Sequence, residues 1–169
     1  MAAVKKRAIN VVRGKAMTVT PTPDGTRGRS FPRNTLARAF LALNTGIYRL
    51  GRGRGLSARM LLLTTVGARS SRERVVPLAY FADGDRAWLV IASAGGDLRH
   101  PAWYRNLARH PDIAWVEFGG NKARVRAESL QGAEREERWR EITSQAPNFA
   151  AYQRQTDREI PVVRLTQIE

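Results

Sequence analysis

The chain has 169 residues, which suits one domain with a sizeable hydrophobic core. It contains no cysteine and only two histidines, which excludes a disulfide framework and a thiolate nucleophile and disfavours a zinc site. No apolar run approaches the roughly 20 residues that cross a membrane, and the basic start lacks the apolar core of a secretory signal. The sequence therefore predicts a cytoplasmic protein without a metal.

The net charge of +14 is concentrated near the N-terminus. Residues 1–59 carry 13 lysines and arginines against one acidic residue, whereas residues 60–169 carry 16 against 14. A basic leader on a nearly neutral body attracts anionic surfaces, so we expect contact with an anionic membrane through residues 1–50. Nucleic acid is the less favoured partner, because the body lacks the aromatic strand motifs of RNA-binding domains.

The N-terminal part is predicted to comprise a leader and one helix. Prolines and glycines punctuate residues 17–32, which indicates that residues 1–32 form a basic flexible leader. Apolar residues then recur at intervals of four, three, four and three: Leu36, Phe40, Leu43, Ile47 and Leu50. This spacing predicts an amphipathic helix over 33–50. We expect it to pack on the body, and attachment to a membrane surface is the alternative.

From residue 60 onward the pattern is mainly that of β-strands. Two apolar runs, 60–63 and 75–80, predict a hairpin, and further strands are predicted over 87–93, 113–118, 122–130 and 160–165. Helices are predicted over 101–109, 133–145 and about 148–154. Consecutive hairpins with short interposed helices favour a mainly β fold, an antiparallel barrel with peripheral helices, over a parallel α/β sheet.

The loop inside the first hairpin is the strongest candidate for a binding site. Residues 64–74 read TTVGARSSRER, so hydroxyls, small residues and arginines make up most of the loop. Hydroxyl and backbone N–H groups donate hydrogen bonds, and arginine adds a charged planar fork that fits phosphate oxygens. We interpret the loop as a clamp for a phosphorylated ligand, with a solvated basic turn as the alternative.

The helix that follows Pro101 carries the second candidate site. Trp103, Asn106 and Leu107 lie at i, i+3 and i+4, so one helix face combines a large ring with an amide that needs a partner. Pro77 inside a strand run must lie at an edge or a bulge, where ligands often approach. No nucleophilic triad is apparent, so an enzyme built on this chain would need a cofactor.

Four blocks of the sequence resemble the deazaflavin (F420)-dependent nitroreductase and quinone reductase family. They are LLLTTVGARS at 61–70 with RVVPL at 74–78, ASAGG at 92–96, HPAWYRNL at 100–107 with His110-Pro111, and Tyr152-Gln153 with TDREIPVV at 156–163. The resemblance covers residues 35 to 165 approximately. It implies that residues 33–169 form a split β-barrel of the flavin-reductase type, which binds coenzyme F420.

The resemblance also implies roles for individual residues. The phosphate and anionic tail of the cofactor would be held by Arg69, Ser70, Ser71, Arg72 and Arg74. The deazaflavin ring would be lined by Pro77, Ala92, Ser93 and Ala94 and supported by Trp103 and Asn106. Members transfer a hydride from the reduced coenzyme to a quinone, a nitro compound or another planar acceptor. A proton donor is needed as the acceptor becomes an anion, and Tyr152 is the expected donor or a residue that shapes the acceptor pocket.

The chain departs from the family pattern at several positions. Ala68 and Ser71 stand where members often have a basic residue and a glycine, and Ala94 stands where a lysine is common. Ala146 and Phe149 replace the tyrosines of nitroreducing members, which favours another acceptor such as a quinone. Two alternatives remain: the same barrel with an ordinary flavin, and a non-enzymatic protein whose leader binds membrane or nucleic acid. The sequence does not predict the oligomeric state.

Overall fold

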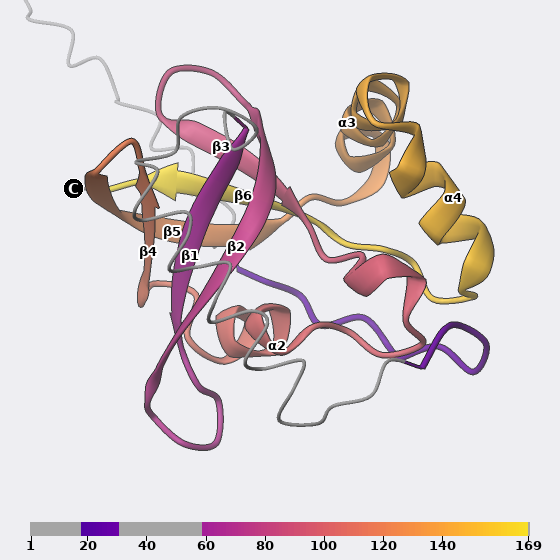
Figure 1. Cartoon of the computed structure of the whole chain (residues 1–169), viewed down its shortest axis with the longest axis horizontal. Helices are drawn as coiled ribbons and strands as arrows, with labels where there is room; N and C mark the ends of the chain where they lie inside the picture. Colours follow the sequence, from indigo (N-terminus) through magenta and orange to yellow (C-terminus); the bar gives the residue numbers. More distant parts are fainter. Residues whose placement is uncertain (1–17, 31–58, 169) are drawn as a thin grey trace, which may run out of the picture.

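Six antiparallel strands close into a barrel in the order β1-β2-β3-β6-β5-β4, as Figure 1 shows. This computed structural model describes residues 18–30 and 59–168. The strands are β1 (Met60–Val66), β2 (Glu73–Ala82), β3 (Ala87–Ile91), β4 (Ala114–Phe118), β5 (Asn121–Ser129) and β6 (Val162–Gln167). The predicted mainly β barrel is confirmed, whereas the helix predicted over 33–50 lies outside the described residues.

Within the described residues, four helical segments surround the barrel: η1 (Ala94–Gly96), α2 (Ala102–Arg109), α3 (Gly132–Gln145) and α4 (Pro147–Gln155). In Figure 1, α2 lies below the strands, and α3 and α4 lie beside β3 and β6. The last strand begins at Val162 and not at Ile160, because Pro161 has no N–H to offer to the ladder. The first strand extends to Val66, three residues beyond its predicted end, because Thr64, Thr65 and Val66 still pair with β2. The remaining predicted boundaries agree to within one or two residues.

Alternating side chains of the strands divide the apolar residues into two clusters. One cluster fills the barrel and is closed at one end by α2; it includes Leu61, Leu63, Val90, Leu165, Trp103 and Leu107. The other joins the outer face of β3 and β6 to the two C-terminal helices; it includes Leu89, Ile91, Val162, Ile142 and Phe149. Both clusters immobilise the strand ends and α2, which carry the candidate site.

Residues 18–30, which we call the strap, lie along the body and do not form the flexible linker that the sequence predicts. Val19 is 3% exposed and belongs to the cluster inside the barrel. Backbone groups of the strap are hydrogen-bonded to the body: Thr18 to Ser129, Thr20 to Tyr104 and Gly25 to Leu98. Prolines at positions 21 and 23 favour extended backbone, and such backbone has N–H and C=O groups free to pair with neighbours.

No helix in the described ranges is long and apolar enough to cross a membrane.

Candidate functional site

The barrel wall is interrupted beside β2, and a cleft lies at the interruption. β2 pairs with β1 over residues 73–79, but with β3 only through Tyr80, Phe81 and Ala82. Within the described residues, the part of β2 around Pro77 thus pairs on one side only, as a proline inside a strand requires. The cleft has a volume of about 970 Å³ and lies between this part of β2, the hairpin loop, the end of β3 and α2.

The cleft brings together most of the residues that the sequence indicated. Eight of them line it: Arg69, Ser70, Arg74, Pro77, Ser93, Ala94, Trp103 and Asn106. The structure adds Arg105, which the helical-face argument had left out because it points away from the face of Trp103 and Asn106. These residues come from four elements that are far apart in the sequence, which makes this cleft the candidate site.

Four other predicted residues do not line the cleft. Ser71 and Arg72 lie in the exposed part of the hairpin loop, and Ala92 is fully buried in the barrel cluster. Tyr152 lies on α4, where its half-buried ring packs edge-on against that of Phe149, with centroids 6.0 Å apart. The structure thus does not bring the Tyr152 hydroxyl to the cleft, and its role as proton donor remains a prediction.

Asn106 connects α2 to the hairpin loop. Its Oδ1 accepts a hydrogen bond from the N–H of Ala68 at 3.0 Å, and its Nδ2 donates one to Oγ1 of Thr65 at 3.0 Å. Asn106 and Thr65 are both buried, so the bond between them is shielded from competing water, whereas the bond to Ala68 is partly buried. The sequence predicted that the Asn106 amide needs a partner. In the structure, this amide positions the loop that carries Arg69 and Ser70.

The hairpin loop is closed by backbone bonds around a residue with positive φ. The N–H of Ser71 donates to the carbonyl of Gly67, and the N–H of Gly67 donates to the carbonyl of Arg72, both at 2.9 Å. Ser71 has a φ of 50°, in the left-handed region that glycine adopts most readily. The serine thus carries a conformational cost at a position where the family resemblance implies glycine.

Replacing Ser71 with glycine is expected to raise the free energy of unfolding by about 1 kcal/mol, because it relieves this cost. Denaturant unfolding of the purified protein measures the change. Ser70→Gly in the same loop is the matched control. Ser70 is not among the residues with positive φ, so this variant should be neutral or destabilising. Equal stabilities of the two variants would contradict the explanation.

The second wall of the cleft is a left-handed turn over residues 93–97. Ser93 is right-handed, and Ala94, Gly95 and Gly96 follow with φ of 46°, 60° and 80°. A right-handed residue followed by a left-handed one directs successive N–H groups to the same side, where they can bind an anion or a carbonyl. Among the described residues, the N–H groups of Ser93, Ala94 and Gly95 have no hydrogen-bond acceptor. Of these three residues, Ser93 and Ala94 line the cleft.

The charges of the cleft are unevenly distributed. Its described lining contains Arg69, Arg74 and Arg105 and no acidic residue, together with apolar residues such as Pro77 and Trp103. Arg105 forms an ion pair with Asp24 of the strap at 3.0 Å. Burial tends to raise the pKa of Asp24, but the hydrogen bond from the His100 N–H and the charge of Arg105 outweigh it, so this pKa lies below its ordinary value. The cleft suits a ligand with an anionic end and a planar end.

A split β-barrel with such a cleft defines a class of reductases that bind a planar, phosphorylated cofactor. The model of the family described as F420H(2)-dependent quinone reductase matches residues 43–167. The chain belongs to this family. It is therefore an oxidoreductase whose cofactor is coenzyme F420, and both expectations from the resemblance are confirmed.

Individual relatives agree with this assignment. The chain is 38% identical over 136 residues to the F420H(2)-dependent quinone reductase Rv1261c of Mycobacterium tuberculosis, covering 75% of this chain and 89% of the relative. A solved F420-H2 dependent reductase, FDR-A, is 37% identical and superposes with a TM-score of 0.57 over 63% of this chain and 93% of its own. Another solved chain, described as a domain-swapped dimer, is 31% identical with a TM-score of 0.58 and coverages of 76% and 98%.

The residues of the cleft fit this coenzyme. The arginines of the lining match an anionic group, and its apolar residues match a planar ring. Within the described residues, no cluster of histidines and carboxylates could hold a metal ion.

Proposed function

We propose that this chain binds reduced F420 in the cleft between the hairpin loop, α2 and the turn 93–97, and reduces a quinone that stacks on the ring. The observation that carries the proposal is a cleft whose described lining combines three arginines and no acidic residue with apolar residues such as Pro77 and Trp103. When bound, F420 supplies a hydride. The chain's own residues bind, orient and screen the reactants from water.

The lining residues receive separate roles in this proposal. Arg69, Ser70 and Arg74 bind the phosphate, and Arg105 extends the positive end toward the tail. Pro77, Ser93, Ala94 and Trp103 surround the ring. Ser71 and Arg72 contact only a tail that extends beyond the cleft, and Ala92 contributes through its backbone, because its side chain is buried. These assignments follow from which side chains line the cleft.

Two measurements on the purified full chain test the function. Titration with F420 and with an ordinary flavin is expected to give tight binding of F420 only, and steady-state assays should show faster reduction of a quinone than of a nitroaromatic compound. The second expectation rests on Ala146 and Phe149, which stand where nitroreducing members of the family have tyrosines. In this chain the Phe149 ring packs against those of Phe81 and Tyr152. A preference for the flavin would contradict the assignment of F420 as the cofactor. A preference for the nitroaromatic compound would contradict the assignment of a quinone as the acceptor.

We also propose that the basic leader attaches this enzyme to the cytoplasmic, anionic face of the membrane, where a lipid-soluble quinone is found. The support is the excess of cations among residues 1–59 over a nearly neutral remainder. The strap limits the truncation that can test this idea, because residues 18–30 contribute to the barrel core. A variant that lacks residues 1–17 removes five of the basic residues and leaves the strap in place.

The full chain is expected to sediment with anionic vesicles and to be released by salt, whereas the variant without residues 1–17 should bind at least tenfold more weakly. Each lysine or arginine near such a surface contributes about 1 kcal/mol. Zwitterionic vesicles are the control for charge, and reduction of a water-soluble quinone is the control for folding. Unchanged sedimentation of the truncated variant would refute the role of the leader.

A further inference from the structure

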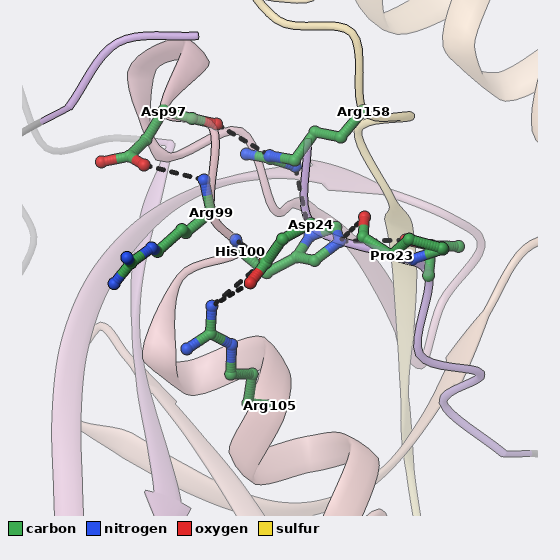
Figure 2. A network of polar contacts seen from close by, with 8 residues as sticks. Pro23, Asp24, Asp97, Arg99, His100, Arg105 and Arg158 are labelled. Atoms are coloured by element: carbon green, nitrogen blue, oxygen red, sulfur yellow. Dashed lines mark hydrogen bonds and ion pairs between the residues drawn. The ribbon is translucent and has the colours of Figure 1, made fainter. Parts of the chain in front are cut away.

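Behind the wall of the cleft, one buried arginine spans the turn 93–97. Arg158 is 3% exposed. Its Nη2 donates to the carbonyl of Ser93 at 2.7 Å, and its Nε donates to the carbonyl of Asp97 at 2.8 Å. Nη1 lies 3.2 Å from Nδ1 of His100, and Figure 2 shows this contact beside the bond to Asp97. A single planar guanidinium therefore fixes both ends of the turn.

His100 in turn fixes Arg158. A guanidinium cannot accept a hydrogen bond, so Nδ1 of His100 is the acceptor and carries no proton. Nε2 lies 3.0 Å from the carbonyl of Pro23 and 3.1 Å from Oγ1 of Thr22, so the proton is assigned to Nε2. Burial, and next the charge of Arg158, lower the pKa of His100 below its ordinary value. The imidazole is thus held neutral in one tautomer.

The strap completes the network. Asp24 accepts a hydrogen bond from the N–H of His100 at 2.8 Å and pairs with Arg105, which lines the cleft. Figure 2 shows His100 with Asp24 and Pro23 on one side and Arg158 on the other. Contacts therefore extend without a gap from the strap to the turn at the cleft wall.

The charge of Arg158 acts on the cleft through one peptide group. The carbonyl of Ser93 and the N–H of Ala94 belong to the same peptide. A charged donor on the carbonyl polarises that peptide and strengthens its N–H as a donor. Ala94 lines the cleft. The charge of buried Arg158 therefore makes the Ala94 N–H a stronger hydrogen-bond donor at the cleft. A reduced ring carries more electron density than an oxidised ring and gains more from such a donor.

We propose that Arg158 is a positioning residue for the reductase: it holds the turn 93–97 in its left-handed form and strengthens the Ala94 N–H toward the reduced ring of F420. This inference rests on the proposed placement of the cofactor in the cleft. Lysine cannot replace arginine here, because a single ammonium lacks the planar fork that reaches two carbonyls and an imidazole.

The test compares affinities for oxidised and reduced F420 in the full chain and in Arg158→Lys. We expect the variant to bind reduced F420 about tenfold more weakly and oxidised F420 about threefold more weakly, because the loss of one charged donor costs the electron-rich form more. The potential of the bound cofactor should therefore fall. Amide exchange of residues 93–97 should be faster in the variant even without cofactor.

Arg164→Lys is the matched control. Arg164 also bonds three groups, Asp83, Glu128 and Glu134, but none of them lines the cleft. This variant should lose stability while both affinities change less than twofold. A second variant, His100→Gln, leaves Arg158 in place without its imidazole and should weaken binding of the reduced form about threefold.

The outcomes separate the two proposals. If the unmodified chain binds no F420, the assignment of the cleft fails. If the unmodified chain binds F420 and either Arg158→Lys or His100→Gln, once folded, keeps the normal ratio of the two affinities, the positioning role of Arg158 is refuted. A ratio that changes equally in Arg164→Lys refutes it as well, because the effect is then a general loss of stability.

Discussion

Replacing Arg69 and Arg74 together with alanine is expected to weaken F420 binding about 100-fold with little change in stability. Both side chains are exposed and line the cleft. Each charge-assisted hydrogen bond to an anionic group contributes about 1.5 kcal/mol or more, and each 1.4 kcal/mol corresponds to a tenfold change in affinity. Neither guanidinium is bonded to another side chain of residues 18–30 and 59–168, so the double variant leaves no side-chain partner unpaired within these ranges. Fluorescence titration with F420 measures the loss.

Arg72→Ala is the matched control for this double variant. Arg72 belongs to the same loop and has the same charge, but it does not line the cleft. We expect the affinity of Arg72→Ala for F420 to fall by less than threefold. Arg72 contacts only the part of the tail that extends beyond the cleft, where water and salt weaken a charge interaction. Normal binding by the double variant would show that the anionic end of the cofactor lies elsewhere. An equal loss in Arg72→Ala would show that loop charge matters and loop geometry does not.

The parts of the fold that the sequence predicted are those with local causes. Strand alternation and the turn residues of each hairpin lie within about ten residues of sequence, and they predicted the strand boundaries to within two positions, except that β1 extends three residues further. The closure of the barrel depends on pairs such as β1 with β4 and β3 with β6, which join distant segments. Periodicity contains no information on such pairs, so the barrel rested on the order of hairpins and on the family resemblance.

The candidate site shows the same limit at the level of side chains. Helical spacing placed Trp103 and Asn106 on one face, and both are buried there. The partners of Asn106 lie 38 and 41 residues away in the chain, so spacing within the helix could not identify them. Arg158 escaped notice because an arginine is ordinarily exposed, and only the fold reveals the carbonyls that satisfy it.

The strap illustrates why a segment rich in proline and glycine does not by itself reveal its structure. The same residues are typical of a flexible linker and of an extended segment that pairs with a surface. What decides between them is a set of long-range partners, here including the Asp157 carboxylate, which accepts hydrogen bonds from the N–H groups of Thr26 and Arg27. The predicted flexible leader extended to residue 32. In the structure, its residues 18–30 form the strap, which packs on the body and contributes to the positioning network.

Asn106→Leu is expected to lower the free energy of unfolding by about 2 kcal/mol and to weaken F420 binding about tenfold. The substitution keeps the volume but removes the acceptor for the Ala68 N–H and the donor to the hydroxyl of Thr65, a residue that is 1% exposed. A buried polar group without a partner costs about 1 to 3 kcal/mol. The affinity falls because the loop that presents Arg69 and Ser70 is no longer fixed to α2.

A double-mutant cycle with Thr65→Val separates these two effects. Valine removes the hydroxyl that Asn106→Leu leaves unpaired, so the double variant should regain part of the lost stability. It should not regain affinity, because the Ala68 N–H still lacks its acceptor and the loop remains unanchored. Denaturant unfolding and F420 titration on all four proteins provide both readouts. If affinity recovered together with stability, Asn106 would affect binding only through the stability of the barrel. Recovery of stability alone would identify the amide as the group that holds the phosphate-binding loop in place.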